Sequence, residues 1–235
     1  MKILAIESSA GPASAAVIEN GKIIASAYSN VKLTHSQTIM PMVKSILSAS
    51  LTDISDINAV AVSAGPGSFT GIRIGISAAK GIATPNKLPC IPVSTLLSMA
   101  YNFLGHNAVV CAVMDARCNQ VYNALFKIEG NKVLRLCDDR ALLCDELANK
   151  LKAANYEHII LCGDGADIFY PFVMDIDGIN LAPANLKYQN ATSVAMVADS
   201  TFSDEICVSA QKLLPIYLRL PQAERELKAK LKINK

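Results

Sequence analysis

The chain has 235 residues, of which 51% are hydrophobic and 18% are charged, and its formal net charge is +2. This composition excludes extended disorder and allows one or two domains with a sizeable core. It also excludes a bilayer-spanning helix, because no apolar run approaches the required length. A polycationic nucleic-acid binder is excluded because the charges nearly balance.

The cysteines and the N-terminal residues predict a cytoplasmic protein. The seven cysteines show no Cys-x-x-Cys spacing, and several lie in apolar runs, where a thiol behaves as a small buried hydrophobe. The first apolar run ends at Glu7, which is too early for the core of a signal peptide. The sequence therefore favours neither disulfides nor a zinc site nor a membrane anchor.

The first half of the chain predicts three antiparallel strands followed by α/β units. Asn20-Gly21 lies between two apolar runs and is a strong hairpin signal. The predicted elements are strands over 3–6, 15–19 and 22–27, a helix over 36–48, a strand over 59–63, a glycine-rich turn at 65–71, a helix over 72–83 and a strand over 88–93.

The second half repeats this order. Its predicted elements are strands over 110–114, 120–128 and 132–136, a helix over 146–154 capped by Asp145, a strand over 158–162 and a glycine turn at 163–165. Each half thus predicts the order β-β-β-α-β-turn-α. Given twice, this is the layout of the actin, Hsp70 and sugar-kinase superfamily, so we expect a duplicated, ribonuclease H-like α/β fold with two lobes.

The repeat also predicts the domain boundaries. We expect a first lobe over 1–102 and a second over 103–220, with the segment 95–107 as the link between them. Residues 221–235 hold five basic and two acidic side chains and are predicted to form a basic helix that could pack back on the first lobe. A solvated helix face is the alternative for this stretch.

The glycine-rich junction joins a strand to a helix and has two possible roles. Gly65 and Gly67 allow backbone conformations closed to other residues, and Pro66 fixes one backbone angle. Ser68 or Thr70 can cap the helix that follows, and Gly71 lies close to its start. Such a junction can aim bare N–H groups at an anion, or it can let a neighbouring backbone come very close.

The helix after this junction has more apolar surface than one sheet can cover. Arg73 and Lys80 are its only charged residues, whereas a surface helix usually exposes half of its circumference or more. Gly71, Gly75 and Ala79 recur every four residues and would permit close approach of another helix. Burial of this helix within its own domain remains an equally weighted alternative.

The preceding helix supports a partner interface because methionines extend its apolar surface. We predict a partner-binding surface on these two helices. Its predicted residues are Ile39, Met40, Val43, Leu47, Phe69, Ile72, Arg73, Gly75, Ile76 and Ala79.

Three acids are predicted to be vestigial phosphate or metal positions. Glu7 and Asp115 end the first strand of each half, and Asp164 lies in the second glycine turn. Acids near phosphates are required to hold magnesium in phosphotransferases, so a small-molecule phosphotransferase that uses these acids is one alternative. A metallopeptidase is another, although the three histidines lack metal-binding spacing. We predict no catalytic residue and no metal ligand.

Several short motifs occur in the order found in one known family. They are residues 3–9 (ILAIESS), 35–37 (HSQ) with Pro41, 65–75 (GPGSFTGIRIG), 115–117 (DAR) and 215–219 (PIYLR). The chain thereby resembles the bacterial TsaB family, also called YeaZ. The resemblance covers the whole chain, and the long glycine motif is highly specific. Two departures are Glu7, where the family usually has aspartate, and the segment 182–188, which matches the family's pattern poorly.

The resemblance implies a subunit of the machinery that makes N6-threonylcarbamoyladenosine beside the anticodon of tRNA. In that family the subunit is a non-catalytic paralogue of TsaD, pairs with TsaD through its first two helices, and forms a homodimer through the same surface when alone. The ATPase TsaE joins the assembly, and TsaC supplies threonylcarbamoyl-adenylate. The resemblance therefore implies no cofactor on this chain, with ATP and metal on the partner subunits, and contact with tRNA only through the complex.

Overall fold

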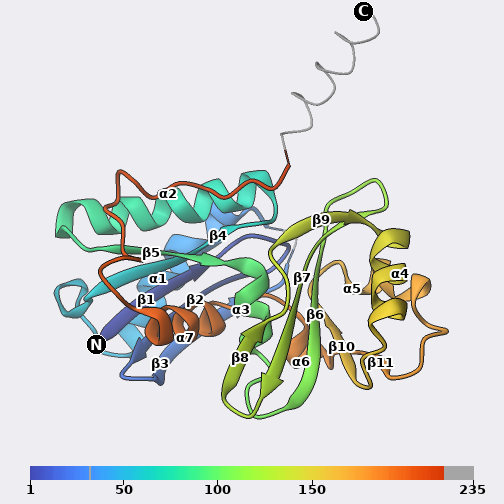
Figure 1. The fold of residues 1–235 in the computed structure, drawn as a ribbon. Coiled ribbons are helices and arrows are strands. Elements are labelled where there is room, and N and C mark those ends of the chain that lie inside the picture. The colour runs from blue at the N-terminus through green and yellow to red at the C-terminus, as the bar shows by residue number, and fades with distance from the viewer. Residues whose placement is uncertain (32, 220–235) are drawn as a thin grey trace, which may run out of the picture.

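The computed structural model describes residues 1–31 and 33–219 as two α/β lobes that lie side by side (Figure 1). The predicted C-terminal helix over 221–235 lies outside the described residues. Among the described residues, no helix is both long enough and apolar enough to cross a membrane.

The first lobe contains a five-stranded sheet with the order β3-β2-β1-β4-β5. The first three strands pair antiparallel, and β4 and β5 continue the sheet in parallel. Its strands are β1 (Lys2–Glu7), β2 (Ala13–Glu19), β3 (Lys22–Ser29), β4 (Ala59–Gly65) and β5 (Cys90–Ser94).

Helices cover both faces of this sheet, and β1 shows why. Its residues alternate between the faces, and all of its interior residues are apolar: Leu4 and Ile6 pack on one side, and Ile3 and Ala5 on the other. The first side is covered by α1 (His35–Ala49) and α2 (Phe69–Asn86), and the second by α7 (Ala191–Thr201).

The second lobe repeats the topology. Its sheet has the order β11-β10-β6-β7-β8, with β9 also paired to β7, so three antiparallel strands are again followed by parallel ones. Its strands are β6 (Asn107–Asp115), β7 (Gln120–Glu129), β8 (Lys132–Arg135), β9 (Arg140–Leu143), β10 (Ile159–Cys162) and β11 (Ile179–Leu181). The predicted duplicated actin and Hsp70-like fold is thus confirmed.

The segment 95–107, predicted to link the lobes, joins β5 of the first sheet to β6 of the second, and it contains a buried helix. This helix, α3 (Thr95–Tyr101), lies between the two sheets (Figure 1). Leu96 and Met99 are fully buried in the core that faces the second sheet. The lobes therefore share packed apolar surface through α3.

The range predicted for the second lobe, 103–220, includes a helix that packs on the first lobe. The chain returns to the first lobe after Gln189, and α7 packs on β1 and β2, where the Ala191 amide donates to the Ser14 Oγ. The second lobe's own helices are α4 (Cys144–Ala154), the short α5 (Ala166–Phe169) and α6 (Ala184–Lys187). The predicted cap Asp145 instead lies inside the first turn of α4, whose N-cap position is Leu143.

Candidate functional site

The glycine junction is shaped for close backbone contact. A Cβ on Gly71 would lie 2.1 Å from the Ser8 carbonyl oxygen, and a Cβ on Gly75 would lie 2.4 Å from the Ser8 Oγ. The Ser68 amide donates to the Ser9 carbonyl at 2.7 Å. The glycines predicted to admit another helix therefore admit the end of β1 from the same chain.

The other side of the junction is covered by a segment that we name the C-terminal strap, residues 207–219. Gly65 has a φ of +131°, and a Cβ on it would lie 2.3 Å from the Ile216 carbonyl oxygen. The Ile216 amide donates to the Ala64 carbonyl at 2.7 Å. Protein backbone thus fills both sides of the turn, so the close-approach role, rather than anion binding, accounts for these glycines.

Helix α2 begins at Phe69, three residues earlier than predicted, because its cap is in place. The Ser68 side chain accepts from the Gly71 amide at 3.2 Å and satisfies one of the free donors of the first turn. The predicted capping role of Ser68 is confirmed. This start places Phe69 and Arg73 on the outer surface of the first turns.

Most of the predicted partner-binding residues lie in the core of the first lobe instead. They pack with the apolar residues of β1 and β4, so their apolar stripe is the one that covers the home sheet. The buried ones are Ile39, Val43, Ile72, Gly75, Ile76 and Ala79, and Leu47 is half-buried against the same core. A substitution at Gly75 or Ile76 would change the fold rather than probe an interface.

A groove on the outside of α1 and α2 holds the remaining predicted residues. Met40 is 47% exposed there, and Phe69 and Arg73 lie on the opposite wall. The groove is lined by Ser36, Met40, Phe69, Thr70, Arg73, Ile74, Ser77 and Ala78. We name this surface the α1–α2 groove.

Ile74 and Ala78 were missed by the sequence analysis although a signal was available. They are four residues apart and lie one position after Arg73 and Ser77 on the helix, so they continue the outward stripe. The predicted surface instead took the more apolar stripe of Ile72, Ile76 and Ala79, which is the stripe that a sheet buries.

Arg73 is held on the groove by two aromatic rings. Its guanidinium carbon lies 3.7 Å from the centroid of the Phe69 ring and 5.8 Å from that of Tyr217. Its Nε donates to the Tyr217 hydroxyl at 2.7 Å. The two rings are themselves stacked, with centroids 4.9 Å apart. The strap therefore contributes Tyr217 to the edge of the α1–α2 groove.

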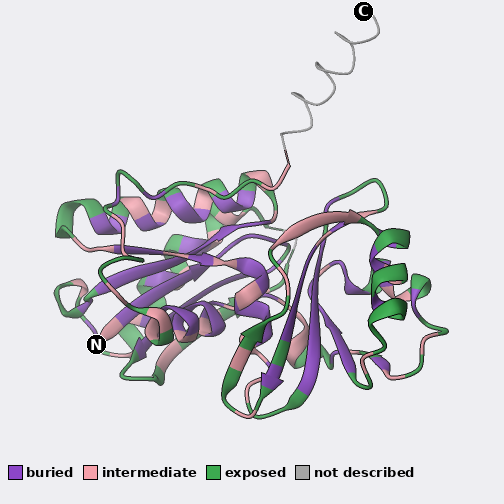
Figure 2. Cartoon of the chain, viewed as in Figure 1, coloured by how far each residue is buried: buried purple, intermediate pink, exposed green. Residues whose placement is uncertain are grey.

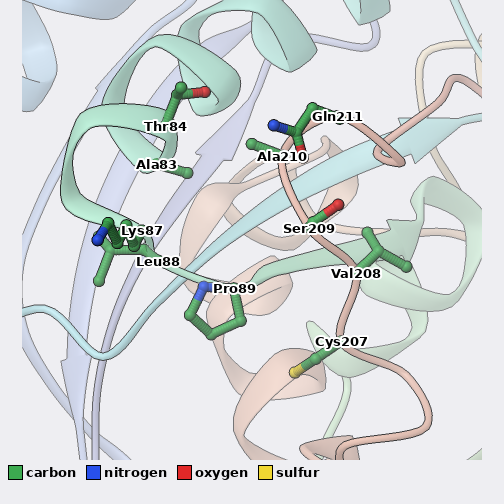
Figure 3. A pocket seen from close by; sticks show the side chains of 10 residues that line it. All are labelled: Ala83, Thr84, Lys87, Leu88, Pro89, Cys207, Val208, Ser209, Ala210 and Gln211. Carbon is green, nitrogen blue, oxygen red and sulfur yellow. The ribbon is translucent and has the colours of Figure 1, made fainter.

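A second pocket lies where the strap begins (Figure 3). It separates the C-terminal end of α2 from the start of the strap, and Val208 there pairs with Cys90 as an isolated bridge. Its walls are Ala83, Thr84, Lys87, Leu88, Pro89, Cys207, Val208, Ser209, Ala210 and Gln211.

Glu7 is fully buried at the end of β1, and its oxygens already have partners. Its Oε1 accepts from the Ser9 amide at 2.6 Å, and its Oε2 accepts from the Ser63 hydroxyl. Burial raises the pKa of Glu7, and the hydrogen bonds from Ser63 and Ser9 oppose the rise. A carboxylate engaged in this way fastens β1 to β4.

In the second lobe, Asp115 ends β6 as Glu7 ends β1, and Asp164 lies in the glycine turn after β10. Burial raises the pKa of Asp164 to about 6, the hydrogen bond from Gln189 opposes the rise, and the charges of Asp115 and Glu7 add to it. Asp115 Oδ1 accepts from the Arg117 amide at 2.7 Å.

These acids do not fit a magnesium or phosphate site. Within residues 1–31 and 33–219, no group of three or more His, Cys, Asp or Glu side chains is arranged to hold a metal ion. Glu7 and Asp164 instead accept hydrogen bonds from protein groups. We derive no reaction step from them.

Comparison with known proteins places these features in a family. The family model described as TsaD, tRNA N6-adenosine threonylcarbamoyltransferase, matches residues 23–228. The "tRNA threonylcarbamoyladenosine biosynthesis protein TsaB" of Escherichia coli is 33% identical over 232 residues, which is 98% of this chain and 100% of that protein. The chain belongs to the TsaB family.

Two further relatives extend this assignment. The TsaB of Bacillus subtilis is 26% identical over 226 residues, covering 95% of this chain and 96% of that protein. The solved structure titled "YeaZ from Pseudomonas aeruginosa" is 26% identical, has a TM-score of 0.79, and covers 92% of this chain and 99% of that one. The predicted resemblance to TsaB is therefore confirmed in sequence and in fold.

Proposed function

We propose that this chain is a non-catalytic scaffold subunit required for N6-threonylcarbamoyladenosine modification of tRNA. It pairs through the α1–α2 groove with a TsaD-like catalytic paralogue, and the pair recruits a TsaE-like ATPase. The names of the TsaB relatives and the match to the threonylcarbamoyltransferase family model support a role in this modification. The groove is the single structural observation that carries the pairing.

The groove has the composition of a protein interface. Met40 and Phe69 supply adaptable and aromatic contact area, and Arg73 is the only charged residue among the described ones that line the groove. Ile74 and Ala78 form its floor between two helices that are themselves fixed on the sheet. Covering the apolar part of this surface with a partner stabilises the complex by roughly 25 cal/mol per Å² before the costs of association.

The non-catalytic part of the proposal rests on how the acids are used. Glu7 and Asp164 hold neighbouring elements together, and the glycine turn is filled by backbone of the same chain. In this proposal ATP and metal belong to the partner subunits, and tRNA contacts the chain only within the complex. When alone, the chain pairs with a second copy through the same groove.

The test is copurification with the catalytic paralogue from the same genome. Ile74→Glu puts a charge on the half-buried floor of the groove, so we expect it to abolish recovery of the paralogue. Ile168→Glu is the control, because it makes the same change at an isoleucine that is 45% exposed on α5 of the second lobe. Both variants should melt within a few degrees of wild type.

Modification is measured in cells that depend on the gene. We expect Ile74→Glu to lower the threonylcarbamoyladenosine content of tRNA, and Ile168→Glu to leave it unchanged. Recovery of the paralogue by Ile74→Glu at the wild-type yield would refute the groove as the interface. Full modification in cells that lack the chain would refute the function.

A further inference from the structure

The C-terminal strap is attached to both lobes. Val208 exchanges two backbone hydrogen bonds with Cys90, at 2.8 and 2.9 Å, and Leu213 is fully buried in the core of the first lobe. At its other end, Arg219 donates to the carbonyl of Ala116 in the second lobe at 2.8 Å. Figure 1 shows the strap running along the outer side of α2 between these points. Tyr217 therefore stands at a defined place beside the groove.

Tyr217 leaves Arg73 little freedom. The stack on Phe69 and the hydrogen bond from Nε to the Tyr217 hydroxyl restrict the guanidinium to one orientation. Within the described part of the chain, the terminal Nη1 and Nη2 groups of Arg73 make no hydrogen bond or ion pair. An exposed arginine held in this way can still donate from both terminal nitrogens, and it loses little side-chain entropy when it binds a partner.

The surroundings of Arg73 determine what it can bind. Every other described residue that lines the groove is uncharged, so a partner that covers the groove would remove water from the guanidinium, and the other lining residues would supply no counter-charge. An unpaired charge in an interface is costly, whereas a carboxylate bound by two parallel N–H···O contacts offsets the loss of water. The occupant must therefore bring an acidic side chain.

This requirement distinguishes a different protein from a second copy. In a two-fold pairing, the same groove lies on both sides, and none of its lining residues within 1–31 and 33–219 is acidic. A second copy would bring another Arg73 and no carboxylate from its own groove.

We propose that Arg73, clamped by the Phe69 ring and the Tyr217 hydroxyl, is the anchor of the heterodimer and binds an Asp or Glu carboxylate on the catalytic paralogue. The C-terminal strap is then part of the partner-binding surface. This inference rests on the proposed function. It adds the chemical identity of the contact and the reason why the paralogue binds more tightly than a second copy.

The experiment measures the dissociation constant between the full chain and the purified paralogue by titration calorimetry. Arg73→Gln removes the charge and keeps a long polar side chain, and we expect binding about 100-fold weaker. Arg73→Lys keeps the charge but removes the planar guanidinium with its two parallel N–H donors, and should weaken binding about tenfold. Lys152→Gln, which removes one charge from exposed α4 in the second lobe, is the matched control and should change binding less than twofold.

Tyr217→Phe tests the clamp because it removes one hydroxyl and keeps the stacked ring. We expect about fivefold weaker binding in the wild-type background, and no further loss when it is added to Arg73→Gln, since the hydroxyl acts through the guanidinium. Self-association, measured by sedimentation, should not weaken in Arg73→Gln. Melting temperatures check that each variant is folded.

The outcomes separate the two proposals. If wild type binds the paralogue and Arg73→Gln binds within threefold of it, the anchor is refuted and the scaffold function stands. If the losses of Arg73→Gln and Tyr217→Phe simply add, the clamp is refuted. If wild type does not bind the paralogue at all, both proposals fail.

Discussion

The two lobes share one sheet topology but present different outer surfaces. In both, a first strand ends on an acid and a glycine turn packs against the end of that strand, as Gly71 does on Ser8 and Gly163 on Val113. The helices differ. Helix α1 contains one Lys, Arg, Asp or Glu in fifteen residues, whereas α4 contains four in eleven.

The turns also lead into helices of different length. The first is followed by α2, with 18 residues, and the second by α5, with four. Figure 2 shows exposed residues along the outer side of α4, and buried and exposed residues mixed along α2. Duplication thus preserved the packing at the strand ends, while the outer helices became a groove in one lobe and a solvated surface in the other.

The largest expected effect is on the contact between a glycine turn and the end of a strand, which occurs in both lobes. Gly71→Val would drive a side chain into the Ser8 carbonyl, and we expect a loss of about 3 kcal/mol or more in the free energy of unfolding. Gly81→Ala is the control, because no atom lies within 4 Å of its added Cβ, and it should stabilise the helix by about 0.5–1 kcal/mol. Urea unfolding measures both, and equal midpoints would contradict the close contact.

The difference in outer surface is tested next. Met40→Glu, on the exposed rim of the α1–α2 groove, should weaken binding of the catalytic paralogue at least tenfold, because it puts a charge where the partner would cover an apolar side chain and competes for Arg73. The same change at Met174, which is 62% exposed in the second lobe, should leave binding unchanged. Equal losses would mean that both lobes contact the partner.

Asp164, a buried acid in the second lobe, makes the stability of the protein depend on pH. Burial raises the pKa of Asp164 to about 6 from an ordinary value of 3.8, so the folded protein holds a proton that the unfolded chain releases. Its contribution to stability is fully present below about pH 4 and is lost as the pH rises through about 6.

Asp164→Asn removes this dependence and still accepts from Gln189. We expect the variant to be more stable than wild type by about 2 kcal/mol at pH 7.5, with the difference vanishing near pH 4. Chemical unfolding across this range measures it. Asp175→Asn, at an exposed position, is the control, and a pH-independent difference for Asp164→Asn would rule out the titration.

The smallest effect concerns the start of α2. Ser68→Ala removes the side-chain acceptor for the Gly71 amide and should cost about 1 kcal/mol. The same change at Asn190, whose side chain caps α7, should cost a similar amount. A much larger loss at Ser68 would show that the cap also fixes the junction, and thermal unfolding of the two variants compares them.

The sequence alone determined the duplicated order of strands, helices and glycine turns. Some signals are local and can be recognised without knowledge of the fold. They include the alternation of residues in strands, the Asn20-Gly21 hairpin and the Ser68 cap. The family motifs were equally readable, because they lie on single short segments such as 65–75.

Only the tertiary structure decided which apolar stripe faced outward. A sequence shows that α2 has two apolar stripes but not that Ile72 and Ile76 meet the sheet while Ile74 meets solvent. The same holds for α7, which returns across the chain to β1, and for Tyr217, which reaches Arg73 from 144 residues away. Such contacts depend on where distant segments cross, and no local pattern records that.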